Sequence, residues 1–309
     1  MPLPGGKQGG TMKKLRDKWG GLSERTREKV RDVAFLSPSV LGVAVFFIVP
    51  FFVIIYYSVI NNPIQNKFVF LDNFIALIKN SAFRTAAKNT AVFSAIAVPL
   101  AVILSFLMAQ MLEARIPLKS QFRTFFLSPM MVPVASVVLI WQVLFSNNGT
   151  VNDFLALFGV DKIDWLKSQY AQVVVVILFL WKNLGYNMIL FMAALNNIPR
   201  ELIEVAELEG ANPWFKFTRI TLRYLSPTIL FVTILSLINS FKVFREVYLL
   251  TGEYPVESLY MLQHFMNNTF KSLDYQKLSS AAILMAVVMV IIIALLFVLE
   301  DKLGKDVEG

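Results

Sequence analysis

The sequence predicts an all-α integral membrane protein with six transmembrane helices and a cytoplasmic helix-turn-helix loop between the fourth and fifth. Two observations carry this prediction. Hydrophobic residues make up 56% of the chain and charged residues 16%, against about 25% charged residues in soluble domains. The apolar residues also lie in blocks separated by polar connections, and a block of about 20 apolar residues is long enough to cross the hydrocarbon core of a bilayer.

Six stretches are nearly free of charged residues, which matters because an unpaired charge in hydrocarbon costs several kcal/mol. The six ranges are Val33 to Ile60, Lys88 to Glu113, Arg123 to Asp153, Ala171 to Asn196, Ser226 to Leu250 and Lys277 to Glu300. We expect all six to be helices, since a lipid-exposed backbone must satisfy its own hydrogen bonds. Pro50, Pro99, Pro129 and Pro133 are expected at kinks or helix ends.

Lysines and arginines in the connections predict the orientation, because cytoplasmic loops are richer in them. With six spans, 18 of these residues fall on the side of the N-terminus and eight on the other. Both termini are therefore expected in the cytoplasm. The predicted organisation is a basic N-terminal tail (1–32), a six-helix domain (33–300) that contains the helix-turn-helix loop (197–225), and a C-terminal tail (301–309).

The composition excludes most enzyme chemistry. The chain has no cysteine and one histidine, so disulfides, cysteine nucleophiles and Cys/His metal sites are excluded, and no catalytic or metal-binding residue is predicted. His264 is expected at the surface. No GxxxxGK[ST] phosphate-binding sequence occurs, so no nucleotide or other cofactor is expected in this chain. The basic residues that give the chain its net charge of +8 lie mostly beside the spans. Their position favours contact with membrane lipid over binding of nucleic acid.

The loop at 197–225 has strong local signals for a helix, a turn and a second helix. Pro199 suits a first turn, Gly210 can take the left-handed conformation that stops a helix, and Asn212 can cap a new helix with Pro213 at its first position. Acidic residues recur at spacing three on the first helix and basic residues follow on the second: Glu201, Glu204, Glu207, Lys216, Arg219 and Arg223. The pattern predicts an exposed two-helix projection, and an interfacial loop that its charges merely solvate is the alternative.

This loop resembles the Glu-Ala-Ala loop of ABC-importer permeases. The resemblance rests on Glu204-Val205-Ala206, then Gly210, Ile220 and Leu222 at the family's spacing. The chain departs from the pattern at Val205, where the family has Ala, and at Arg223, where it has Pro. Further segments resemble the carbohydrate-uptake branch, the maltose-type first permease subunit: Leu71–Phe74, Phe125–Pro129, Trp165–Leu166, Trp181–Met188 and Ser240–Phe244.

The resemblance implies a function and a set of partners. The chain would form half of the pathway for a sugar or oligosaccharide in the bacterial cytoplasmic membrane. Its partners would be a second, similar permease subunit, two cytoplasmic ATPase subunits that hold ATP and Mg, and an extracytoplasmic solute-binding protein. The loop would insert into a groove of the ATPase, and the implied coupling residues are Glu204, Ala206, Gly210, Ile220 and Leu222.

Eight polar or charged residues inside the fourth and fifth stretches are candidates for the solute pathway. Ionisable groups within a span usually face a wet cavity or pair with each other, and amide and hydroxyl groups suit sugar hydroxyls. The candidates are Lys182, Asn183, Asn187, Asn239, Ser240, Lys242, Arg245 and Glu246. The charged ones could instead snorkel or tie helices together, and the neutral ones suit helix packing equally well.

A stand-alone secondary transporter or channel for a polar solute is the alternative function. Its expected signs are paired inverted repeats with broken helices, or a selectivity-filter segment. Neither is evident in the sequence.

Overall fold

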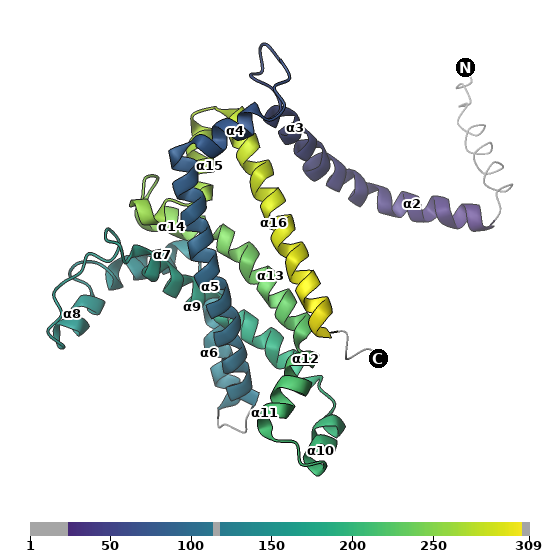
Figure 1. The fold of residues 1–309 in the computed structure, drawn as a ribbon, viewed down its shortest axis with the longest axis vertical. Coiled ribbons are helices and arrows are strands. Elements are labelled where there is room, and N and C mark those ends of the chain that lie inside the picture. Colours follow the sequence, from purple (N-terminus) through teal and green to yellow (C-terminus); the bar gives the residue numbers. More distant parts are fainter. Residues whose placement is uncertain (1–23, 114–117, 305–309) are drawn as a thin grey trace, which may run out of the picture. The chain divides into compact units, whose positions relative to one another are not determined.

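The computed structural model describes residues 24–113 and 118–304, and within them the chain is almost entirely helical (Figure 1). In this part of the chain the only β-type pairing is one isolated bridge between Ile60 and Phe68. Internal contacts divide the chain into two compact units, residues 1–57 and residues 58–309. Most of the predicted N-terminal tail, together with Arg115 and Lys305, lies outside the described residues. The predicted division into residues 1–32, 33–300 and 301–309 stays a prediction.

The first unit holds one long helical run. It consists of α2 (Glu24–Val43), a short π-helix η1 (Ala44–Ile48) and α3 (Val49–Ser58), whose last residue belongs to the second unit. Pro50 follows the π-turn directly, where the Val49 amide bonds back to the Ala44 carbonyl. The wider turn accommodates a proline ring that can neither donate a hydrogen bond nor fit against a regular preceding turn. The predicted kink at Pro50 is thus a local widening of the helix.

Among the described residues, five helices are long and apolar enough to cross a membrane, and they confirm five of the six predicted spans. They are Arg31–Ser58, Ser81–Glu113, Ala171–Asn196, Ser226–Thr251 and Tyr275–Lys302. The second is α5, the third is α9 (Ala171–Asn196), the fourth joins α13 (Ser226–Lys242) to α14 (Phe244–Thr251), and the fifth is α16 (Tyr275–Gly304). Pro99 lies inside α5, which continues without a break.

The stretch from Arg123 to Asp153 is not one straight helix. Its first part is α6 (Lys119–Met131) and its second is α7 (Val134–Leu144), and the two are bent by 100°. Val132 is extended (φ −83°, ψ 128°), as expected before proline, and Pro133 has no amide to continue the ladder of α6. The chain therefore reaches six spans if this bent pair counts as one. A short helix, α8 (Thr150–Ala156), follows.

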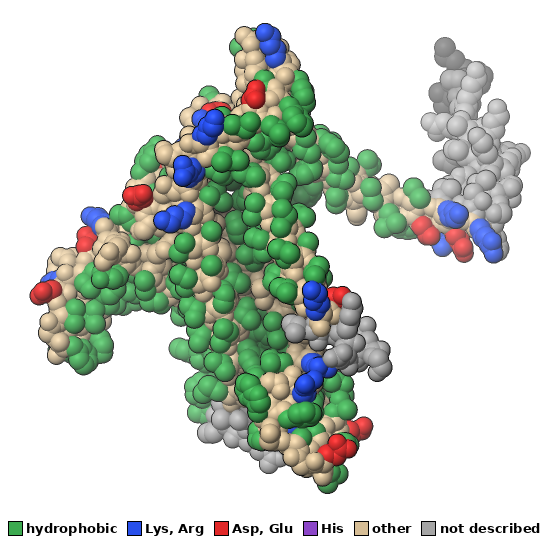
Figure 2. Space-filling view, viewed as in Figure 1, with side chains coloured by type: hydrophobic (Ala, Val, Ile, Leu, Met, Phe, Trp, Pro, Cys, Tyr) green, Lys and Arg blue, Asp and Glu red, His purple; other side chains and the backbone are tan. Residues whose placement is uncertain are grey.

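The surfaces of the long helices are apolar on the side that faces away from the protein core. On α5 the exposed side chains recur at intervals of three or four residues: Val92, Ile96, Leu100, Ile103, Leu107 and Met111. The opposite face of α5 is also apolar and is buried, with Phe93, Ala97 and Ala101 fully enclosed. A helix that is apolar all round is typical of a membrane span. Figure 2 shows these faces as broad hydrophobic surfaces, with charged side chains collected near the ends of the helices.

Helix α9 lies at the centre of the second unit and packs against α5, α6 and α13. Its contact with α6 is unusually close, since a Cβ atom on Gly185 would lie 1.8 Å from the backbone oxygen of Phe126. Two backbones can approach this closely only where a residue without a side chain separates them. Along α9, one buried cluster includes Val174, Val175 and Leu178, and a second includes Met188 and Phe191.

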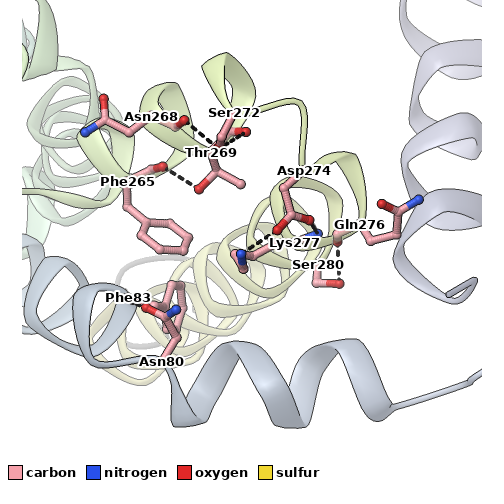
Figure 3. Close-up of polar contacts among 10 residues, drawn as sticks. All are labelled: Asn80, Phe83, Phe265, Asn268, Thr269, Ser272, Asp274, Gln276, Lys277 and Ser280. Carbon is pink, nitrogen blue, oxygen red and sulfur yellow. Dashed lines mark hydrogen bonds and ion pairs between the residues drawn. The ribbon is translucent and has the colours of Figure 1, made fainter. Parts of the chain in front are cut away.

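At the end of the unit away from the loop at 197–225, capping groups fix the starts of α5 and α16 (Figure 3). The Phe83 amide donates to the Asn80 side chain at 3.0 Å, and the Lys277 amide donates to the Asp274 carboxylate at 3.1 Å. Phe83 also packs edge-on against Phe265 of α15 (Leu262–Lys271), with ring centroids 5.4 Å apart. Helix α4 (Asp72–Lys79) precedes α5, and a 3-10 turn, η3 (Glu257–Leu259), precedes α15. The contact between Phe83 and Phe265 joins α5 to α15, which also packs against α16.

Candidate functional site

The loop between α9 and α13 folds as the predicted helix, turn and helix. The first helix is α10 (Arg200–Leu208). The second runs through α11 (Pro213–Phe215), a π-helical segment η2 (Lys216–Thr221) and α12 (Leu222–Tyr224). The Asn212 side chain accepts a hydrogen bond from the Phe215 amide at 2.8 Å, with Pro213 at the first helical position. These are the capping roles that the sequence predicts for both residues.

Gly210 ends α10 in the left-handed conformation, with φ +77°. The Ala211 amide donates to the Ala206 carbonyl at 2.8 Å, and the Gly210 amide donates to the Glu207 carbonyl at 3.0 Å. This pair of bonds is the Schellman motif, which satisfies the last carbonyls of a helix. A Cβ atom at Gly210 would meet nothing within 4 Å. The backbone dihedral, and not local space, is therefore what requires glycine.

Helix α10 has two different faces. Ile203 packs against the buried cluster around Phe191, and Ala206 is half-buried. By contrast, Leu202, Val205 and Leu208 recur at spacing three and are 40%, 53% and 89% exposed. Trp214 and Phe215, just after the turn, are 71% and 50% exposed. We call these five residues the loop patch; exposed apolar patches are typical of surfaces that contact another protein or a membrane.

The loop is also connected to the interior of the helical unit. Phe217 of η2 lies against Phe106 of α5, with ring centroids 6.0 Å apart, and Phe106 lies against Phe191 of α9 at 5.5 Å. Ile220 packs against the same buried cluster as Ile203. Between the two loop helices, the Lys216 ammonium and the Glu207 carboxylate are 2.6 Å apart. The loop is therefore joined to α5 and α9 through packed side chains.

The implied coupling residues occupy different places in this loop. Glu204 is exposed beside the loop patch, and Ala206 supplies a carbonyl to the Gly210 turn. Ile220 and Leu222 are half-buried on the second helix. Sequence reasoning missed the loop patch, although its spacing of three residues on α10 was visible beside the acidic residues.

A cavity of about 840 Å³ lies between α9, α13 and α14. Six of the eight candidate pathway residues line it: Lys182, Asn183, Asn239, Lys242, Arg245 and Glu246. Phe244, Tyr248, Gln263 and Met130 are also on its wall, and the last three were not singled out from the sequence. The volume falls in the range of about 300–1,000 Å³ that is usual for small-molecule sites.

An ion pair joins the two sides of this cavity. The Lys182 ammonium of α9 contacts the Glu246 carboxylate of α14. Glu246 is 7% exposed, and its second carboxylate oxygen has no hydrogen-bond partner among the described residues. Within the same part of the chain, no carboxylate pairs with Lys242 or Arg245, and both side chains are exposed.

The amide and hydroxyl candidates divide into two groups. On the cavity wall, the Asn239 side chain donates to the Asn183 side-chain oxygen at 2.9 Å. Asn187 is buried and donates to the Ser236 hydroxyl at 2.9 Å, and Ser240 is buried with its hydroxyl 2.8 Å from that of Ser94. Asn187 and Ser240 therefore tie α9 and α5 to α13 and do not line the cavity. A direct solute contact by any of the eight remains a prediction.

His264 is fully buried, contrary to the expectation of a surface residue. It lies in the first turn of α15, where its Nδ1 accepts from the Met261 amide at 3.5 Å. Its ring packs edge-on against Phe244, with centroids 4.7 Å apart. Burial lowers the pKa of His264 to about 4, because an apolar site disfavours the charged ring. The sequence could not show this, since the packing comes from α14.

We expect the pH dependence of stability to report this histidine. Because its folded pKa is below the ordinary value of about 6.5, its contribution is complete above pH 6.5 and is lost as the pH falls toward 4. Asparagine can replace the Nδ1 acceptor but does not titrate, so His264→Asn should lose less thermal stability between pH 7.5 and pH 5. The measurement is the unfolding midpoint in detergent at both values. Equal losses in the two proteins would contradict the prediction.

The sequence matches a known family of membrane proteins. The family described as binding-protein-dependent transport system inner membrane component matches residues 101–309. The lactose transport system permease protein LacF of Rhizobium radiobacter is 30% identical over 280 residues, which cover 88% of this chain and 93% of LacF. The sn-glycerol-3-phosphate transport system permease protein UgpA of Escherichia coli O157:H7 is 31% identical, with 84% and 89% covered.

A solved structure has the same fold. It is a bacterial ABC transporter involved in the import of the acidic polysaccharide alginate, and one of its chains matches with a TM-score of 0.77 and 22% identity. The match covers 90% of this chain and 99% of that one. A second structure, of a bacterial alginate ABC transporter with an alginate pentasaccharide-bound periplasmic protein, matches with a TM-score of 0.75 and 22% identity, covering 88% of this chain and 96% of that one.

Proposed function

The chain belongs to the family of binding-protein-dependent transport system inner membrane components. From this we propose that it carries a sugar or a related polar solute past Lys182 and Glu246. We also propose that it couples to a separate ATPase through α10. Because this family consists of components of binding-protein-dependent transport systems, we set aside the alternative of a stand-alone secondary transporter or channel. The observation that carries the coupling half of the proposal is the loop patch on α10 and α11, beside a turn that is set by Gly210.

The loop has the physical properties that a coupling element needs. It offers exposed apolar side chains that lose contact with water when a partner covers them, and Leu208 and Trp214 are the most exposed among them. It is stiffened by the Schellman turn and by the contact between Lys216 and Glu207. Its inner side packs on α5 and α9. Closing of an ATPase around α10 would thus move the helices that surround the cavity.

Val205 is compatible with this role although the family pattern has alanine there. Its side chain is 53% exposed and belongs to the loop patch, so the extra carbons enlarge the apolar contact with a partner. Arg223, which stands where the family has proline, is half-buried in α12. The helix continues past it to Tyr224.

ATP hydrolysis is assigned to a partner because the chain contains no phosphate-binding loop. The other proposed partners are a second permease subunit and an extracytoplasmic solute-binding protein. We propose that the α10 end of the chain lies on the cytoplasmic side, since lysines and arginines are in excess on that side of the predicted topology. Both termini would lie on that side as well.

The absence of cysteine from the sequence allows a direct test of the coupling surface. A single cysteine at Leu208, labelled with a maleimide that carries a photoreactive group, should form a covalent product with a co-purified ATPase subunit when the membranes are illuminated. Leu157→Cys is the matched control, because Leu157 is 79% exposed and lies after α8, far from the loop in sequence. Cross-linking of both variants to the ATPase, or of neither while the complex remains intact, would reject the loop patch as the contact.

A further inference from the structure

We propose that the solute carried by this chain is an anion, a sugar or polyol bearing a carboxylate or phosphate group, which Lys242 and Arg245 bind in the cavity between α9, α13 and α14. This inference rests on the proposed pathway and narrows its substrate class. It begins from the charges on the cavity wall. The lining residues include three cationic side chains, Lys182, Lys242 and Arg245, and one carboxylate, Glu246.

The single carboxylate is already used within the chain. Glu246 contacts the Lys182 ammonium, and both side chains are largely enclosed, with 10% and 23% of their surfaces exposed. This pair is neutral as a unit. The remaining lining charge comes from Lys242 and Arg245, so the wall presents an excess of two positive charges.

Lys242 and Arg245 are positioned to act together. Lys242 is the last residue of α13 and Arg245 the second of α14, with Val243 at the junction between the helices. Both side chains are exposed and both line the cavity. Among the described residues, neither forms an ion pair with an acidic side chain. An arginine fork and an ammonium group on the same cavity wall are together well suited to a carboxylate or phosphate.

Because both residues lie inside a candidate membrane span, it is costly for their charges to remain without water or a counter-charge. Lys242 precedes the end of the span at Thr251 by nine residues, or roughly 14 Å at 1.5 Å per residue. A charge at such a depth is stable only if it faces water or an opposite charge. Two adjacent like charges in one cavity also repel each other, and an anionic solute would relieve that repulsion.

Neighbouring groups on the wall suit the rest of such a solute. Asn183, Asn239 and Gln263 supply amide donors and acceptors, and Phe244 and Tyr248 supply aromatic surface. Amides bond to hydroxyl groups, and aromatic rings pack against the apolar face of a sugar ring. The wall thus combines an anion-binding end with groups that are typical of carbohydrate sites.

The test uses the complete complex, with its second permease, ATPase and binding protein, in proteoliposomes. ATP-driven uptake is measured for two matched pairs of probes: trigalacturonate against neutral galactotriose, and sn-glycerol 3-phosphate against glycerol. We expect an anionic member to enter at least tenfold faster than its neutral partner. Lys242→Gln and Arg245→Gln should each lower that uptake about tenfold, whereas Lys242→Arg should retain most of it. Lys67→Gln, which removes an exposed charge from the loop after α3, is the control and should leave uptake unchanged.

Several results would overturn the inference. These are uptake of neutral members alone, uptake of no probe, and a preference that the two glutamine variants leave unchanged. Loss of the second permease from the Lys242→Gln complex would also overturn it, since that result would show that a carboxylate of that subunit is the true partner. Failure of the proposed function has a different signature, because the chain would then not co-purify with an ATPase at all.

Discussion

Gly210→Val should abolish solute uptake while the protein still reaches the membrane and assembles with its partners. Gly210 has φ +77°, a conformation that costs a residue with a side chain roughly 1–2 kcal/mol, and a β-branched residue more. To escape this strain the chain must give up the bonds from Ala211 to Ala206 and from Gly210 to Glu207. The end of α10 then points elsewhere, and the loop patch no longer presents one surface to the ATPase.

Gly210→Asn is the matched variant that separates conformation from size. Asparagine tolerates the left-handed region far better than valine, and the space beside Gly210 is open within this chain. Gly210→Asn should therefore keep a large part of the uptake. The measurements are uptake and ATP hydrolysis in proteoliposomes, with the amount of intact complex determined by co-purification. Normal uptake by Gly210→Val would refute the coupling role of the turn, and equal loss in both variants would assign the effect to side-chain size in the partner's groove.

The loop could be predicted in detail because its signals are local. Asn212, Pro213 and Gly210 each act on residues no more than five positions away, through a cap, a fixed φ and a left-handed turn. The membrane spans could also be predicted from the sequence, since the length of a charge-free stretch is a property of a single segment. Pro133 predicts a break in the helix but not the 100° bend between α6 and α7. The direction of the chain after a proline depends on what the next helix packs against.

Contacts between segments far apart in the sequence could not be predicted in this way. Lys182 and Glu246 were both candidates, yet their pairing joins residues 64 positions apart. Asn187 and Ser240 have the same polar character as Asn183 and Asn239, but their places on α9 and α13 turn them into helix contacts instead of cavity lining. His264 is buried by Phe244 of another helix. Polarity identified the right helices, and only the packing shows which face of each helix meets the cavity.

The ion pair between Lys182 and Glu246 should show strong coupling in a double-mutant cycle. Lys182→Met would leave the 7% exposed Glu246 carboxylate without its partner, and Glu246→Leu would do the same to the ammonium. Removing one member of a buried pair costs about 3–5 kcal/mol, because the other charge stays in a poor solvent for ions. We expect each single variant to lower the unfolding midpoint of the complex in detergent by several degrees and to reduce its amount in the membrane.

The double variant Lys182→Met/Glu246→Leu should recover most of that stability, since no isolated charge remains and apolar groups of similar size fill the space. It should also transport better than either single variant, because removing both members leaves the net charge of the cavity wall at its original value, whereas each single change alters it by one unit. The measurements are the thermal midpoint and the uptake of the wild type, the two single variants and the double variant, which together show whether the two side chains are coupled. If the losses simply add, the two side chains contribute by separate packing contacts and the pair has no coupled role. Recovered stability without recovered uptake would instead mean that the solute contacts the pair directly, which would place these two residues inside the binding site and not only beside it.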